Sequence, residues 1–108
     1  MAREQLQTLS EPMYFLLLAL TKPMHGYEVM QTVGAISGGR VRIGAGTLYA
    51  LLTRFENENI VFQTGGDGRR KIYALADKGR DLLRREYERL RESAAAYDNY
   101  IREENGNG

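Results

Sequence analysis

Apolar residues recur at helical spacing in three stretches of the first half of the chain. Residues 11–21, 25–36 and 45–57 each carry apolar side chains three or four positions apart, so each predicts a helix that buries one face. Pro23 ends the first helix, and Ser37-Gly38-Gly39 ends the second. The side chains predicted to face the core are Met13, Leu16, Leu17 and Leu20 in the first helix, Tyr27, Val29, Met30, Val33 and Ile36 in the second, and Leu48, Leu51, Leu52 and Phe55 in the third.

The pattern then changes from helical spacing to short runs of branched and aromatic residues. Residues 60–63 and 71–75 predict two β-strands, and the glycine-rich segment 64–70 between them predicts a hairpin with a basic exit. After the second strand, helical spacing returns and predicts one helix over 77–104, about 42 Å long. The closing Asn-Gly-Asn-Gly predicts a disordered tail at 105–108.

The last predicted helix has apolar side chains at alternating intervals of four and three residues, which is the spacing of a coiled-coil seam. A helix of this length cannot be covered by the small domain before it, so the seam predicts a partner, and we expect a second copy of the chain. The chain therefore divides into a domain at 1–76 and a dimerisation helix at 77–104. The seam residues are Leu83, Tyr87, Leu90, Ala94, Tyr97 and Ile101.

Three helices followed by a hairpin give the element order of a winged helix-turn-helix domain. The predicted fold class is therefore α+β, mainly α, with the long C-terminal helix added to the winged domain. In such a domain the third helix, here 45–57, enters the major groove of DNA, and the hairpin is the wing that contacts the backbone or an adjacent groove.

Composition excludes several kinds of chemistry. A chain of 108 residues, 43% of them hydrophobic, suits a single globular domain. The absence of cysteine excludes a disulfide scaffold, a thiolate metal site and a cysteine nucleophile, and the lone His25 is predicted to cap or pack at a helix start. No serine has a credible base partner. We therefore expect no enzyme, no metal site and no cofactor.

Neither a membrane span nor a signal peptide is expected. The longest apolar run, 13–20, is far shorter than the roughly 20 residues that cross a bilayer. The first residues lack the charged-then-apolar pattern of a secretory signal. The sequence therefore predicts a cytoplasmic protein.

The positive charges are clustered, although the net charge is only +1. Arg40, Arg42 and Arg54 form one group, within a stretch from 38 to 55 that contains no acid, and residues 69–71 form another. Two such clusters on a balanced domain are typical of a surface that binds an anionic partner. The alternatives are that one of the first three arginines pairs with Glu28 or Glu56, and that the second group is a solvated hairpin tip.

Two short motifs identify a family that has this architecture. His25-Gly26-Tyr27-Glu28 opens the second predicted helix, and Gly46-Thr47-Leu48-Tyr49 opens the third about twenty residues later. Together with the leucine-rich first helix and the 70–75 strand, they resemble the PadR family of bacterial transcriptional regulators over residues 10–90. One departure is Ala50, which stands where the family usually has proline.

The resemblance implies a homodimer that binds double-stranded DNA, most simply as a repressor. The short chain with one C-terminal helix resembles the smaller PadR subfamily, whose members dimerise through that helix and the N-terminal one. Thr47 and Tyr49 also have structural alternatives to DNA contact: Thr47 caps the third helix, and Tyr49 packs under the wing. The DNA-contacting residues implied are Arg40, Arg42, Thr47, Tyr49, Ala50, Thr53, Arg54, Arg69, Arg70 and Lys71.

Tyr87, Tyr97 and Tyr100 leave a further alternative open. Tyrosines at a dimer interface can line a pocket for a small aromatic effector, by stacking and apolar burial, whereas stripes at helical spacing are also made by plain packing. A third alternative is a protein-interaction module that uses the apolar seam and does not bind DNA.

Overall fold

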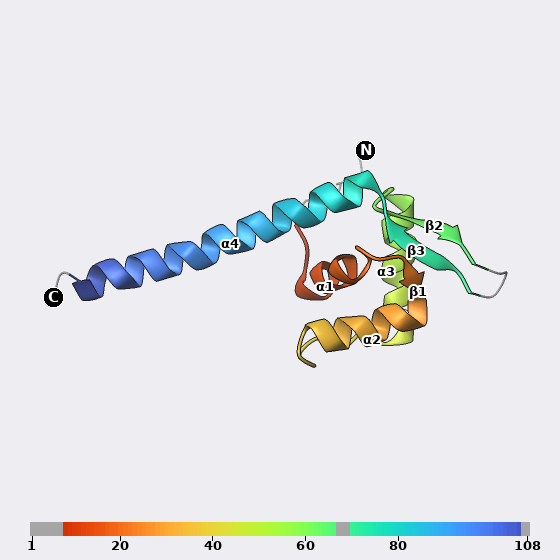
Figure 1. The fold of residues 1–108 in the computed structure, drawn as a ribbon, viewed down its shortest axis with the longest axis horizontal. Helices are drawn as coiled ribbons and strands as arrows, with labels where there is room; N and C mark the ends of the chain where they lie inside the picture. Colours follow the sequence, from red (N-terminus) through yellow and green to blue (C-terminus); the bar gives the residue numbers. More distant parts are fainter. Residues whose placement is uncertain (1–7, 67–69, 107–108) are drawn as a thin grey trace.

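Three short helices, a small antiparallel sheet and one long helix make up the protein (Figure 1). The computed structural model describes residues 8–66 and 70–106. This arrangement is the predicted winged helix-turn-helix with a long C-terminal helix, which confirms the α+β, mainly α, fold class. The elements are α1 (Glu11–Ala19), β1 (Met24–His25), α2 (Gly26–Ile36), α3 (Ala45–Asn57), β2 (Val61–Gly65), β3 (Ile72–Leu75) and α4 (Asp77–Gly106).

The core lies where α1, α2 and α3 meet below the sheet. α1 begins as predicted, because the Ser10 side chain accepts a hydrogen bond from the Met13 backbone N–H at 3.4 Å. The predicted apolar stripe of α3 is also confirmed, since it directs leucines and Phe55 inward. The largest fully buried side chains are Leu16, Leu17, Leu20, Val29, Val33, Leu48, Leu52, Phe55 and Ile60.

The predicted buried face of α2 was wrong at both ends of the helix. Tyr27 is 65% exposed and Ile36 is 44% exposed, whereas Val29 and Val33 are fully buried together with Gly26. Apolar residues lie along two rows of this helix, and the two rows share Val33. The row that packs against the domain places the stiff valines in the core and the small Gly26 against α3. Tyr27 is thereby left on the outer surface.

A tight turn joins α2 to α3. The Ser37 hydroxyl accepts a hydrogen bond from the Val41 N–H at 3.0 Å, and Gly38 and Gly39 adopt φ values of 64° and 80°. Such left-handed backbone suits glycine, so the predicted helix end at 37–39 is confirmed. The turn sets the angle at which α3 crosses α2.

The sheet has the strand order β1-β3-β2 and is antiparallel throughout. The two residues of β1 pair with β3, with Met24 opposite Tyr73 and His25 opposite Ile72. The sequence pattern did not predict β1, because two residues are too few to show alternation. β2 follows Asn59, whose φ of 61° closes α3 in the left-handed conformation.

Only the first turns of α4 pack against the domain. Leu82 and Leu83 are buried there, so Leu83 belongs to the protomer's own core and is not part of the uncovered seam as predicted. The rest of the helix extends away from the domain in Figure 1, and the structure spans 64 Å along its longest axis. The helix continues to Gly106, so residues 105 and 106 are helical where a tail was predicted.

Candidate nucleic-acid interface

The outer side of α3 presents the residues predicted for the recognition helix. Thr47, Ala50 and Thr53 are exposed, and Tyr49 is 47% exposed. The N-cap of α3 is Gly44, so Thr47 does not cap this helix. The start of α3 is therefore open to solvent, with its first amide groups directed outward, as an anion-binding helix terminus requires.

Tyr49 packs against the start of α2. A β-carbon built on Gly26 would lie 2.5 Å from the Tyr49 hydroxyl oxygen, so only glycine lets the ring come this close. The two motifs that opened α2 and α3 in the sequence therefore touch in the structure. This contact differs from the alternative prediction that Tyr49 packs under the wing.

A cleft of about 680 Å³ lies where these two motifs meet the base of the wing. The pairing of β1 with β3 places the start of α2 beside the wing strand, which is why residues distant in sequence share one cleft. Arg70 and Lys71 are exposed and lie at its edge, whereas Tyr73 is buried in its wall. The lining residues are His25, Gly26, Tyr27, Glu28, Tyr49, Arg70, Lys71 and Tyr73.

Tyr73 is held in its neutral form. Burial raises the pKa of Tyr73, and the nearby Glu56 and Tyr49 raise it further. Its hydroxyl therefore stays protonated and can donate a hydrogen bond. The cleft thus combines two cations at its edge, tyrosine hydroxyls and the N-terminus of α2, which favour an anion, with the Glu28 carboxylate, which is engaged by the His25 N–H at 3.1 Å.

The first arginine group is less available than its sequence position suggested. Arg40 pairs with Glu11 at 3.1 Å and Arg54 pairs with Glu58 at 2.9 Å. The Arg42 Nε donates to the Gly39 carbonyl oxygen at 3.4 Å.

The predicted alternative partners of these arginines were wrong. The Glu28 carboxylate accepts the His25 N–H at 3.1 Å, and Glu56 accepts the Gln63 amide at 2.9 Å. The Arg54–Glu58 pair is four residues apart and follows from helical spacing, whereas spacing along the chain could not show that Glu11 lies opposite Arg40. Arg69, which was also predicted to contact DNA, lies outside the described residues.

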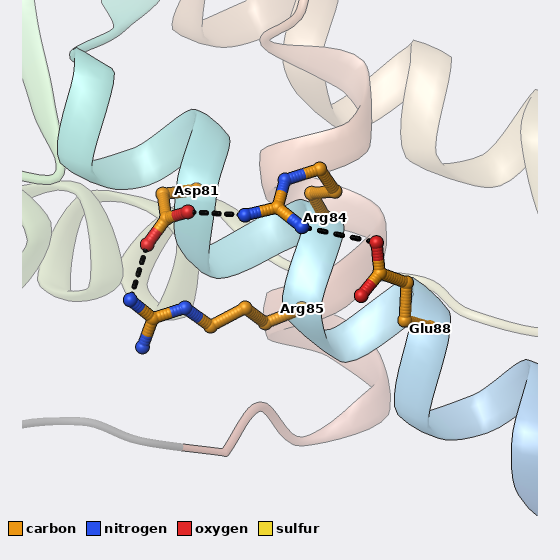
Figure 2. Close-up of polar contacts among 4 residues, drawn as sticks. All are labelled: Asp81, Arg84, Arg85 and Glu88. Carbon is orange, nitrogen blue, oxygen red and sulfur yellow. Dashed lines mark hydrogen bonds and ion pairs between the residues drawn. The ribbon is translucent and has the colours of Figure 1, made fainter.

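Arg84 and Arg85, two exposed arginines near the start of α4, form ion pairs with acids of the same helix (Figure 2). Arg84 bridges Asp81 at 2.6 Å and Glu88 at 3.0 Å, and Arg85 pairs with Asp81 at 2.6 Å. The pairs are three or four residues apart, so they lie along one side of the helix. They form a solvated surface in which the positive charges are compensated by acids of the same helix.

Most of the predicted seam beyond Leu83 is uncovered. Tyr87, Leu90, Ala94 and Tyr97 are exposed, and Ile101 is partly so. At its domain end the seam adjoins a shallow groove of about 300 Å³ between α1 and α4, which Tyr14, Leu18, Leu83 and Tyr87 help to line. Continuous apolar exposure of this kind marks an interaction surface.

Glu86 is the one buried charged residue of the described chain and was missed by the sequence reading. It is 4% exposed, and its carboxylate accepts two hydrogen bonds from the Arg89 guanidinium, at 3.0 Å and 2.6 Å. The Arg89 hydrogen bonds lower the pKa of Glu86 and outweigh its burial, which acts in the opposite direction. Nothing in its surroundings suggests chemistry, so its role is to hold α4 against the N-terminal segment at Leu9.

Within residues 8–66 and 70–106, no group of three or more acidic or histidine side chains is placed to hold a metal ion. In the same part of the chain, no helix is both long and apolar enough to cross a membrane.

Comparison with known proteins decides the family. Residues 15–85 match the family described as "Transcriptional regulator PadR-like family". The chain belongs to the PadR-like family of transcriptional regulators. The matched PadR-like region runs from α1 into the first turns of α4 and includes both motifs and the wing. Its members are regulators of transcription and not enzymes.

Solved structures share the PadR-like fold. A PadR-like transcription factor from Bacteroides fragilis is 29% identical, with a TM-score of 0.63 over 82% of this chain and 86% of that one. RosR of H. salinarum is 21% identical, with a TM-score of 0.65 over 86% of this chain and 94% of that one. The Streptomyces coelicolor regulator PcaV, solved with its natural ligand, is 21% identical, with a TM-score of 0.64 over 90% and 74%.

The chain matches only part of two curated relatives. An uncharacterized 37.1 kDa protein of transposon TN4556 from Streptomyces fradiae is 38% identical over 64 residues, which are 59% of this chain and 18% of that protein. A protein of Lysinibacillus sphaericus is 31% identical over 70 residues, 61% of this chain and 64% of that one. The chain thus spans less than two thirds of either relative.

Proposed function

We propose that this PadR-like protein is a transcriptional repressor that binds a two-fold DNA operator as a homodimer. The observation that carries the proposal is the cationic cleft at the junction of α2, α3 and the wing, because it lies beside the exposed start of α3. A helix seated in the major groove would bring this cleft against the adjacent phosphate backbone. The cleft and the helix then act as one surface.

In this arrangement α3 of each protomer enters one major groove, and the two half-sites lie about one helical turn, or a multiple of it, apart. Lys71 and Arg70 neutralise phosphates from the wing side, and the Tyr49 hydroxyl and the first amides of α2 and α3 supply neutral donors. Arg42 lies farther along the same domain and adds a positive charge, whereas Arg40 and Arg54 would have to exchange Glu11 and Glu58 for phosphate.

The dimer is proposed to form along the uncovered seam of α4. Tyr87, Leu90, Tyr97 and Ile101 lie on one side of a helix that its own domain covers only at the start. A second copy would bury this side by the same surface on both chains, which is how a two-fold dimer closes. The symmetry of the dimer then matches that of the operator.

The wing contact is tested by Lys71→Ala, measured by fluorescence anisotropy with duplex DNA over a salt series. We expect binding to weaken for every sequence, and the slope of log affinity against log salt to fall by about one. Arg70→Ala should behave similarly. The matched control is Arg91→Ala, because Arg91 is an exposed cation on α4. An unchanged slope in both wing variants would remove the wing from the interface.

A second candidate function is a sensor that releases DNA when a small aromatic compound binds at the dimer interface. The groove between α1 and α4 favours it, because Tyr14 and Tyr87 line an apolar hollow beside the seam. Burial raises the pKa of Tyr14, so its hydroxyl stays neutral and can hydrogen-bond a ligand. Among proteins of this fold, PcaV is solved with its natural ligand.

Such a ligand must bind the DNA-free dimer more tightly than the DNA-bound one. Adding planar aromatic compounds to the protein–DNA complex, with tyrosine fluorescence and DNA anisotropy followed together, tests this. Quenching with DNA release supports the sensor, and quenching without release contradicts it. A tight dimer that binds no duplex even at low salt would instead indicate a protein-interaction module.

A further inference from the structure

The exposed side of α3 carries unusually short side chains for a recognition helix. No lysine, glutamine or second arginine stands on it, and its single asparagine is the last residue of the helix. Side chains with paired donors or acceptors are the ones that distinguish guanine and adenine in the major groove. The exposed residues of α3 are Ala45, Gly46, Thr47, Tyr49, Ala50, Thr53, Arg54 and Asn57.

The two long side chains near the middle of this surface are held by the protein itself. Arg54 forms an ion pair with Glu58 at 2.9 Å, one turn farther along the chain. Tyr49 lies against Gly26 at the edge of the cleft. Of the remaining exposed side chains, Ala45 and Thr47 lie in the first turn and Asn57 at the last residue, so Ala50 and Thr53 are left in the middle of the helix, three residues apart on the same side.

Ala50 and Thr53 share one chemical feature, an exposed methyl group. In the major groove only thymine presents a methyl group, at C5, and alanine and threonine methyls pack on it. The Thr53 hydroxyl has no hydrogen-bond partner in the described part of the chain, so this side chain presents both a methyl and a hydroxyl group. These two groups predict different base preferences and can be separated by substitution.

We propose that Ala50 and Thr53 determine sequence specificity by packing their methyl groups on thymine methyl groups in each half-site. This inference rests on the proposed function, because it requires α3 to enter the major groove. It goes beyond that function by naming the base and the atom that are read. This chain has Ala50 where the family usually has proline. One of the two methyl groups therefore lies on a regular helical turn of α3.

The test begins with the full-length protein and a pool of random duplexes, from which the tightest binders are enriched and sequenced. Each thymine of the selected site is then replaced by deoxyuridine, which lacks only the C5 methyl group. We expect about a 3- to 4-fold loss of affinity at one or two thymines of each half-site, the effect of removing one buried methyl group. Deoxyuridine outside the half-sites is the control and should have no effect.

Two substitutions of Thr53 assign the contact. Thr53→Ser keeps the hydroxyl and removes the methyl group, so it should abolish the difference between thymine and deoxyuridine at one position. Thr53→Val keeps the methyl group and removes the hydroxyl, so it should preserve that difference. Ala50→Gly should abolish the difference at the second position, with circular dichroism confirming that the helix content of the variant is unchanged.

Each result has a distinct meaning. A selected site without a shared thymine, or one insensitive to deoxyuridine, overturns methyl reading while DNA binding stands. Sensitivity that Thr53→Ser and Ala50→Gly leave intact overturns the assignment to these residues. Sensitivity lost in Thr53→Val but kept in Thr53→Ser shows reading by the hydroxyl and also overturns it. Failure to enrich any duplex overturns the proposed function itself.

Discussion

Gly79, in the first turn of α4, is a position where adding one methyl group should damage the fold. A β-carbon there would overlap the Ile60 carbonyl oxygen and lie 3.1 Å from both the Ile60 carbonyl carbon and its Cγ2. The same carbonyl accepts the Ala76 N–H at 2.9 Å. The backbone of Ile60 is therefore fixed and cannot turn aside without breaking that hydrogen bond.

The size of the effect follows from two opposing contributions. Replacing glycine by alanine within a helix stabilises it by about 1 kcal/mol. Overpacking a close contact costs about 1–3 kcal/mol, and a clash with backbone lies at the upper end. For Gly79→Ala we expect a net loss of about 2 kcal/mol in the free energy of unfolding, which lowers Tm by about 8–16 °C in a domain of this size.

Gly34→Ala is the matched control, because Gly34 lies inside α2 and a β-carbon there would meet nothing within 4 Å. This variant should be stabilised by up to about 1 kcal/mol. Both are measured by circular dichroism during thermal and urea unfolding, at equal protein concentration because dimerisation shifts apparent stability. If Gly79→Ala proves as stable as Gly34→Ala, the close packing of α4 on the loop before β2 is refuted.

Three further predictions concern the dimer helix and the cleft. Glu86→Gln should destabilise the protein by about 1–2 kcal/mol at neutral pH, because the amide keeps one oxygen acceptor for Arg89 but loses the second acceptor and the negative charge. Because the pKa of Glu86 is lowered in the folded state, its stabilisation is present above the ordinary glutamate range and disappears as pH falls through the folded pKa. Urea unfolding of the wild type and the variant over this pH range tests the prediction, and a stability difference that does not change with pH would contradict it. Leu90→Asp should shift the protein to monomers in sedimentation velocity, and an unchanged dimer would exclude the α4 seam. Gly26→Ala should displace the half-exposed Tyr49 ring and weaken DNA binding in anisotropy titrations with little change in Tm, whereas a large drop in Tm would show that the contact is structural.

Sequence periodicity predicted most of the elements, because long stripes such as the one in α3 leave little choice of face. It failed where two faces compete, as in α2, whose Tyr27 and Ile36 lie outside the core. The pairing of β1 with β3 was beyond its reach, since two residues carry no pattern. The cleft was missed for the same reason, because that pairing is what joins the start of α2 to the wing.

Charge contacts were the least predictable part of the candidate site. Arg40 pairs with Glu11, 29 positions away along the chain, and only the fold brings the two together, whereas the i,i+4 spacing of Arg54 and Glu58 was available from the sequence but was not used. Leu83 fits the seam spacing but is buried in its own domain, because the first turns of α4 serve the core before the helix leaves it. The motif residues at the starts of α2 and α3 were found from sequence, although their contact was not.

A single residue, Ala76, separates the end of the wing strand β3 from the first residue of α4. Its N–H is held by the Ile60 carbonyl, and the Lys78 ammonium donates to the Glu58 carbonyl at 2.9 Å, so this junction has little freedom to bend. The wing and the long helix therefore move as one rigid body. Over a helix of about 45 Å, a tilt of about 5° moves the far end by about 4 Å. In the proposed dimer, small changes in the angle at which the two long helices cross would thus alter the distance between the wings, and with it the spacing of DNA half-sites that both can reach.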